Sequence, residues 1–239
     1  MCTQGEAESP FHSLGNVGNS LSANLLRDSE YQLVPLPAWK RVLDIVFASG
    51  MLFAVSPIMV LSAIYIKTVS TGPVFFRQER IGQGGAAFTC LKFRSMFDGS
   101  NSKLHEEHVA KLVHDGGNML KLHADPRILP GGRIMRLLCI DELPQLINVL
   151  RGEMSLVGPR PCLPYEAEYY LPWHRERFAQ VPGITGLWQV SGKNALSFDE
   201  MVQLDIAYGQ KLSLALDLWI LLKTPFALLQ QACAMGKRS

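Results

Sequence analysis

Two adjacent carboxylates, Asp141 and Glu142, are the side chains of this chain best suited to phosphate chemistry. The apolar spacing over residues 143–150 predicts a helix that begins at or just after Asp141 and closes at Arg151-Gly152. A helix N-terminus attracts phosphate, and two carboxylates can hold a divalent cation that bridges to it. The same pair could serve only to start the helix, with Asp141 as N-cap and Glu142 beside the positive helix end. Spacing alone leaves both interpretations open.

Two arginines flank this acidic pair. Arg136 lies five residues upstream of Asp141, and Arg160 lies downstream in the turn Pro159-Arg160-Pro161, whose prolines stiffen the backbone. Guanidinium groups bind phosphate oxygens through paired, planar N–H donors. We therefore expect Arg136 and Arg160 to supply positive charge around a diphosphate.

A third source of positive charge lies in an expected β-hairpin. Residues 74–81 and 87–96 are typical of two strands, and the glycine-rich stretch 82–85 joins them. Lys92 and Arg94 are two residues apart, so in a strand their side chains point to the same face. Such a pair suits a phosphate, although a solvated strand face explains it equally well.

The composition indicates one catalytic domain in contact with a membrane. Of the 239 residues, 48% are hydrophobic and 18% are charged, whereas roughly 25% of the residues of ordinary soluble domains are charged. The net charge of +2 gives no basic field for nucleic acid, so we expect no nucleic-acid partner. The five cysteines form no CxxC pair, which argues against a zinc site or a disulfide framework. The N-terminus has no pattern of a secretory signal peptide.

One long apolar segment, residues 42–66, follows Lys40 and Arg41 and precedes Lys67. As a straight helix it would reach about 37 Å, which exceeds the ~30 Å hydrocarbon core of a bilayer. Ser56-Pro57 lies inside it, and because proline has no N–H the helix is expected to break there, with Ser56 or a neighbour satisfying the freed backbone group. Basic residues on both sides favour a hairpin that enters and leaves on one face of the membrane. A single span with a kink is the alternative.

These signals divide the chain into three parts. Residues 1–38 are expected to form a disordered tail, residues 39–70 a re-entrant membrane helix, and residues 71–239 the catalytic domain with a variable insertion at 99–124. The apolar stretch 212–229 predicts interfacial helices, with an ordinary buried helix as the alternative.

Five motifs occur in an order that resembles the small monotopic phosphoglycosyl transferases of bacterial polysaccharide and glycoconjugate assembly. They are GPVFFRQERIG, KFRSM, DELPQLINVLRGEMSLVGPRP, PGITGLWQVSGK and LDIAY, and the resemblance covers Trp39 to about Leu229. It implies an α+β fold in which a membrane-embedded re-entrant helix, bent at Ser56-Pro57, precedes a small cytoplasmic catalytic domain. That domain is expected to contain a β-hairpin and interfacial amphipathic helices.

The resemblance also implies a two-step reaction at Asp141-Glu142 that uses Mg²⁺. Asp141 would attack the β-phosphate of a UDP-sugar, release UMP and carry the sugar phosphate until polyprenyl (undecaprenyl) phosphate takes it. This would be the first membrane step of exopolysaccharide or glycoconjugate synthesis. Asp141 and Glu142 are the implied metal ligands. The implied substrate-binding residues are Lys92, Arg94, Arg136, Arg160, Pro159, Pro161, Gln189 and Lys193.

The implied location is the cytoplasmic face of the bacterial inner membrane, with membrane lipid, downstream glycosyltransferases or a homodimer as further partners. The chain departs from the family pattern at residues 138–140, Leu-Cys-Ile, where Thr or Ser is usual, and at Lys193, where arginine is frequent. The first departure keeps open a catalytically silent membrane scaffold for a polysaccharide assembly complex. An aspartyl-phosphate phosphatase is disfavoured, because the D-x-D spacing is absent around Asp141.

Overall fold

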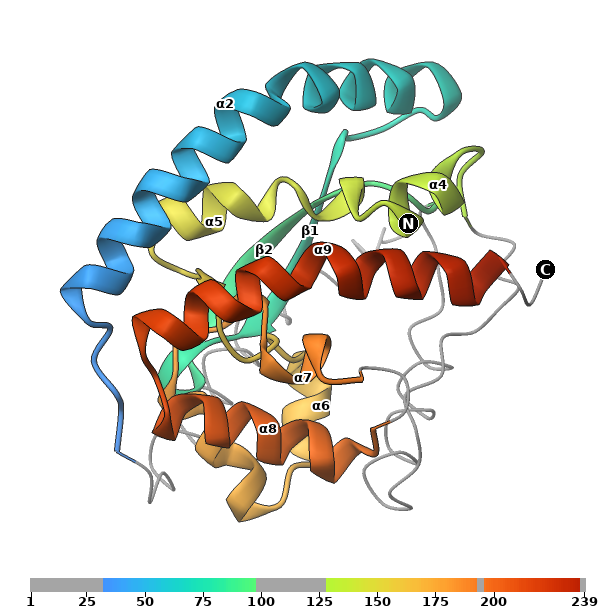
Figure 1. Ribbon diagram of the computed structural model, residues 1–239. Coiled ribbons are helices and arrows are strands. Elements are labelled where there is room, and N and C mark those ends of the chain that lie inside the picture. Colours follow the sequence, from blue (N-terminus) through green and yellow to red (C-terminus); the bar gives the residue numbers. More distant parts are fainter. Residues whose placement is uncertain (1–31, 98–127, 193–195, 237–239) are drawn as a thin grey trace, which may run out of the picture.

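The computed structural model describes residues 32–97, 128–192 and 196–236, and Figure 1 shows their arrangement. Most of the expected tail, the expected insertion at 99–124 and Lys193 lie outside these residues. The described part combines helices with two small two-stranded sheets, which agrees with the expected α+β class.

The long helix α2, Ala38–Val69, contains Pro57 and bends partway along its length (Figure 1). Pro57 has no N–H to donate to the Phe53 carbonyl, and Ser56 Oγ donates to that oxygen instead, at 2.8 Å. The predicted role of Ser56 is therefore confirmed. The sequence suggested that the helix breaks at Ser56-Pro57. Instead, the helix bends there and continues to Val69.

The predicted hairpin is confirmed, with its second strand shorter than expected. Strands β1, Phe75–Ile81, and β2, Ala87–Phe93, pair in antiparallel register. The turn between them needs glycine, because Gly84 and Gly85 have φ values of 66° and 77°, in the left-handed region.

The chain then runs through short helices and a second sheet before two longer helices end it. These elements are α4 (Gly132–Leu137), the 3-10 turn η2 (Ile140–Glu142), α5 (Gln145–Arg151), β3 (Ser155–Val157), α6 (Pro164–Glu168), the 3-10 helix η3 (Pro172–Ala179), β4 (Gly183–Thr185), α7 (Leu187–Val190), α8 (Phe198–Gln210) and α9 (Leu214–Gly236). Strands β3 and β4 pair in parallel.

Both legs of α2 pack on the same domain. The first leg joins a core cluster with α5, β3, α8 and α9, in which Leu43 packs with Val149 and Ile220. The second leg joins another cluster, in which Ile66 packs with Phe93 of β2 and Met135 of α4. The bend at Pro57 therefore lies between two legs that each have their own contact with the rest of the described structure.

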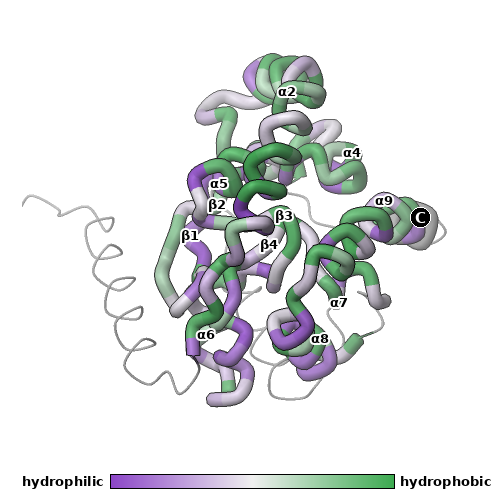
Figure 2. The backbone as a smooth tube through the Cα atoms, turned by 60° about the vertical axis from the view of Figure 1, so that its left-hand side comes forward, coloured by the Kyte–Doolittle hydropathy of each residue, from purple (hydrophilic) through white to green (hydrophobic). Residues whose placement is uncertain are grey.

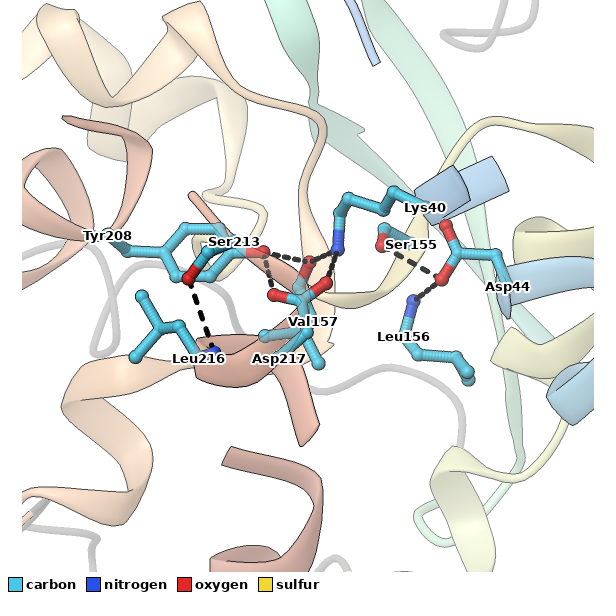
Figure 3. Close-up of polar contacts among 9 residues, drawn as sticks. All are labelled: Lys40, Asp44, Ser155, Leu156, Val157, Tyr208, Ser213, Leu216 and Asp217. Atoms are coloured by element: carbon cyan, nitrogen blue, oxygen red, sulfur yellow. Dashed lines mark hydrogen bonds and ion pairs between the residues drawn. The ribbon is translucent and has the colours of Figure 1, made fainter. Parts of the chain in front are cut away.

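A buried polar network fixes how the first leg is placed against α8 and α9 (Figure 3). Lys40 Nζ donates to Asp217 Oδ2 of α9 at 2.6 Å and to the Val157 carbonyl at 2.9 Å. Tyr208 of α8 donates to the same two residues, at 2.7 Å to Asp217 Oδ1 and at 3.1 Å to the carbonyl. One turn further along α2, Asp44 Oδ1 accepts from the Ser155 hydroxyl and the Leu156 N–H, at 3.0 and 2.9 Å.

The remaining surface of α2 is apolar and exposed, and Figure 2 shows hydrophobic residues along this helix at the outside of the molecule. Among the described helices, α2 alone is long and apolar enough to cross a membrane, by length and composition. Apolar side chains of α9 are exposed as well, including Leu222, Phe226 and Leu229. Exposed apolar surface of this extent marks a contact site, and a membrane suits its composition.

Candidate active site

Asp141 and Glu142 lie in the 3-10 turn η2, and the prediction that a helix begins at or just after Asp141 is wrong. Helix α5 begins at Gln145, and no side chain caps it. The physical reason is Cys139, whose φ of 54° is left-handed and turns the chain out of α4 into η2. The Glu142 N–H donates to the Cys139 carbonyl at 3.1 Å, which closes this turn. A tight turn between two helices therefore holds the two acids.

The environment of Asp141 disfavours its negative charge. The residue is only 9% exposed. Burial, and next the charge of Glu142, raise the pKa of Asp141 to about 6, although Lys92 and Arg136 act in the opposite direction. At neutral pH the carboxylate is therefore ionised yet poorly solvated, a state that favours attack on an electrophile.

Two of the expected cations lie at this pair of acids. Lys92 Nζ is 3.3 Å from Glu142 Oε1, and Arg136 is close enough to lower the pKa of Asp141. Arg136 Nη1 also donates weakly to Met96 Sδ at 3.6 Å, which orients its guanidinium. Strand β2 and helix α4 thus bring one positive charge each to the acids.

Arg94, another of the expected cations, contacts the backbone after α2. Strand β2 ends at Phe93, and the buried Arg94 guanidinium donates to the Thr71 and Ser70 carbonyls at 2.8 and 3.2 Å. These bonds hold the turn after α2, whereas Lys92 contacts Glu142. The role of Arg94 in substrate binding stays a prediction.

The turn Pro159-Arg160-Pro161 lies at the other end of the same hairpin face. Arg80 Nη1 donates to the Pro161 carbonyl at 2.9 Å. Arg80 is opposite Phe88 in the register, and Lys92 is four residues along β2 from Phe88 on the same face, a separation of about 13 Å. Cys90 lies between Phe88 and Lys92 on this face of β2. Burial raises the pKa of its thiol, and the charges of Glu142 and Arg160 also act on that pKa, in opposite directions. The acids and the Arg160 turn therefore both lie near this face of the hairpin.

The segment of β4 and α7 packs closely against the chain next to this turn. A Cβ on Gly183 would lie 2.1 Å from the Gly158 amide nitrogen, so only glycine allows β4 to approach the Arg160 turn. Trp188 is buried in the core below. Gln189 Nε2 donates to the Ile184 carbonyl at 3.3 Å, while its Oε1 is buried and has no hydrogen-bond partner in the described parts of the chain.

Residues 36–231 match the family model described as bacterial sugar transferase. The chain belongs to this family. It is 40% identical over 187 residues to the exopolysaccharide production protein ExoY of Sinorhizobium fredii, an alignment that covers 77% of this chain and 83% of that protein. The UDP-glucose:undecaprenyl-phosphate glucose-1-phosphate transferase of Caulobacter vibrioides is 41% identical over 199 residues, or 80% of this chain and 69% of that protein.

A longer relative, the undecaprenyl-phosphate galactose phosphotransferase of Salmonella typhimurium, is 40% identical over 196 residues, which are 80% of this chain and 40% of that protein. The resemblance seen in the motifs is thus confirmed. This bacterial sugar transferase is an enzyme of the sugar-phosphate transferase class. It associates with a membrane, for which α2 provides the apolar surface.

Sequence reasoning missed three residues that support the site of this sugar transferase: Arg80, Arg177 and Asp205. Arg80 lies within the motif GPVFFRQERIG and Asp205 within the motif LDIAY. Their place in these motifs marked both residues, but it did not indicate that they support the Arg160 turn. Arg177 lies in η3, outside every motif, and nothing local marks it. All three side chains are buried.

The two acids fit a magnesium site of the minimal kind. Mg²⁺ is usually held by one or two carboxylates and completed by water and substrate phosphates. The mutual repulsion of Asp141 and Glu142, which contributes to the raised pKa of Asp141, is what a cation between them would relieve. The described residues hold no cluster of three or more His, Cys, Asp or Glu that would suit a metal held by protein alone.

Proposed function

We propose that this bacterial sugar transferase moves a sugar 1-phosphate from a UDP-sugar to undecaprenyl phosphate and releases UMP. The observation that carries the proposal is the buried acid Asp141, with its raised pKa, beside Lys92 and Arg136. The names of the relatives from Caulobacter and Salmonella describe transfer to undecaprenyl phosphate. The reaction would be the first membrane step of exopolysaccharide or glycoconjugate synthesis.

The chemistry follows from an ionised, poorly solvated carboxylate. An Asp141 oxygen attacks the β-phosphorus of the UDP-sugar, the bond from that phosphorus to the bridging oxygen breaks, and UMP leaves with the electron pair. The resulting acyl phosphate keeps the reactivity of the broken diphosphate. A phosphate oxygen of undecaprenyl phosphate then attacks the same phosphorus, and the bond to Asp141 breaks to restore the carboxylate.

In this proposal, different cations bind different parts of the substrate. Lys92 and Arg136, next to the acids, offset the negative charge of the phosphoryl oxygens and of the attacking carboxylate. Arg160, at the other end of the hairpin face, binds the nucleotide side of the diphosphate. A Mg²⁺ ion held by Asp141 and Glu142 would supply further charge neutralisation on the phosphates.

We further propose that α2 enters and leaves the membrane on one face, the cytoplasmic face of the inner membrane. The contacts of both legs with one domain support this, because a spanning helix would place its ends on opposite sides of a bilayer. The second leg packs against Ile140, next to Asp141, so a lipid phosphate at the membrane surface can approach the acid. Labelling of cysteines introduced at Ala38 and Thr68 tests the topology. Access from the cytoplasmic side alone supports the hairpin, and labelling from opposite sides contradicts it.

A UMP-release assay on the detergent-extracted protein tests the reaction, with a panel of UDP-sugars, undecaprenyl phosphate and magnesium. We expect one donor to release UMP and a radiolabelled sugar phosphate to remain bound to the parent protein when the lipid is withheld. Asp141→Asn should lose both signals, whereas Glu168→Gln, an exposed acid on α6, should keep them. UMP release at the parent rate by Asp141→Asn would overturn the assigned nucleophile. Release of UDP would overturn the reaction.

A further inference from the structure

The backbone that carries Arg160 is held along its whole length. The four consecutive carbonyls of residues 159–162 each accept a hydrogen bond from outside the turn. The donors are, in order, Gly183 N, Arg177 Nη2, Arg80 Nη1 and Ile81 N, at 2.8, 3.0, 2.9 and 2.9 Å. Since prolines on both sides of Arg160 also restrict the backbone, its Cα has little freedom to move.

Arg177 is the donor that reaches the Arg160 carbonyl, and it is itself held on two further sides. It donates to the Asp205 carboxylate, and its Nη1 donates to the Tyr170 hydroxyl at 2.9 Å. Arg177 and Asp205 side chains are 2% and 1% exposed. Burial alone lowers the pKa of Arg177, but Tyr170 and Asp205 outweigh it and raise the pKa, so the residue stays charged. A charged guanidinium with three acceptors fixes the position of each of them.

The Arg160 side chain, in contrast, is not held by the described residues. It is half-buried, and its guanidinium makes no hydrogen bond within the part of the chain that the structure describes. It also lies close enough to the buried Arg80 to disfavour the charge of that residue. Two cations in proximity favour an anion between or beside them.

A buried Arg–Asp pair is a weak source of stability, because the cost of desolvating both ions offsets their attraction. Stability alone therefore does not explain why the pair Arg177–Asp205 is buried. Its geometry offers another explanation, because the Arg177 guanidinium donates to the Arg160 carbonyl. We propose that Arg177, held by Asp205, is a positioning residue that sets Arg160 against the diphosphate of the UDP-sugar. This inference rests on the proposed function and deepens it.

A double-mutant cycle with Arg160 tests the proposal. In Arg177→Lys the charge is kept, but one ammonium cannot reproduce the fixed fork of the guanidinium. We expect the KM for the UDP-sugar to rise by roughly tenfold or more, with the KM for undecaprenyl phosphate unchanged. In an Arg160→Met background the same change should add less than about twofold, because residues that act through one another are not additive.

The control is Arg77→Lys, an exposed arginine on β1, which should leave both KM values unchanged. If Arg177→Lys does not fold, Asp205→Asn is a smaller change that can take its place, measured in the parent and in the Arg160→Met background. Equal losses in the parent and Arg160→Met backgrounds, or losses in both KM values, would show a merely structural role and overturn the proposal. An unchanged donor KM in Arg160→Met would overturn it too, while leaving the transfer reaction intact. Absence of UMP release from the parent with every donor would instead reject the proposed function.

Discussion

Replacement of Asp141 by asparagine should make the protein inactive and more stable at the same time. The pKa of Asp141 is about 6, compared with an ordinary value of 3.8. Because one pKa unit corresponds to about 1.4 kcal/mol, the ionised carboxylate costs the folded state on the order of 3 kcal/mol. Asparagine has nearly the same shape and carries no charge, so it removes this cost.

The sign of the pH dependence follows from the raised pKa. The folded protein holds the Asp141 proton up to a pH of about 6, while the unfolded chain loses it near 3.8. The cost of the charge therefore grows as the pH rises between these two values and is fully present above 6. The stability gain of Asp141→Asn should be small near pH 4 and largest at pH 7 to 8.

Thermal unfolding of the purified protein in detergent and EDTA, at a series of pH values, measures this gain. For a chain of this size, about 3 kcal/mol corresponds to a Tm that is roughly 6–12 °C higher in Asp141→Asn at neutral pH. Added Mg²⁺ should narrow the difference, because a cation at the acids stabilises the ionised parent. Glu168→Gln, which removes an exposed charge, is the matched control and should not change Tm. Equal Tm values for Asp141→Asn and the parent at pH 8 would refute the argument from burial.

Three further results are expected. UMP release should fall as the pH drops below about 6, because Asp141 becomes protonated. Since Lys92 lowers the pKa of Asp141, Lys92→Met should move the midpoint of this pH profile upward. An unchanged midpoint would exclude Asp141 as the titrating group. Lys40→Met should destabilise the fold by about 3–5 kcal/mol in denaturant unfolding, because it leaves the buried Asp217 charge without its cation, whereas Lys40→Met with Asp217→Leu should cost clearly less. Gly183→Ala should lose most UMP release, because its Cβ would lie 2.1 Å from the Gly158 amide nitrogen, directly before the Arg160 turn. Parent activity would show that this turn can move freely.

Local features of the fold could be predicted because their causes are local. Strand alternation and the glycines at 84 and 85 predicted the hairpin. Ser56-Pro57 predicted a disturbed helix and the hydrogen bond that satisfies the freed carbonyl, although the helix bends there instead of breaking. The position of the acids could not be predicted in the same way. The left-handed backbone of Cys139 moves the start of α5 to Gln145, and a non-glycine residue with positive φ leaves no local sequence signal.

The order of the motifs, by itself, determined the family of this chain and pointed to Asp141-Glu142. Only the tertiary structure decided what the basic residues do. Lys40 was interpreted as a charge at the membrane edge, yet it forms a buried ion pair with Asp217, 177 residues away. Arg177 had no motif, yet it holds the Arg160 carbonyl. The role of a basic residue depends on the partner that packing places next to it. For Lys40 that partner lies in the distant helix α9, and for Arg177 it lies in the Arg160 turn.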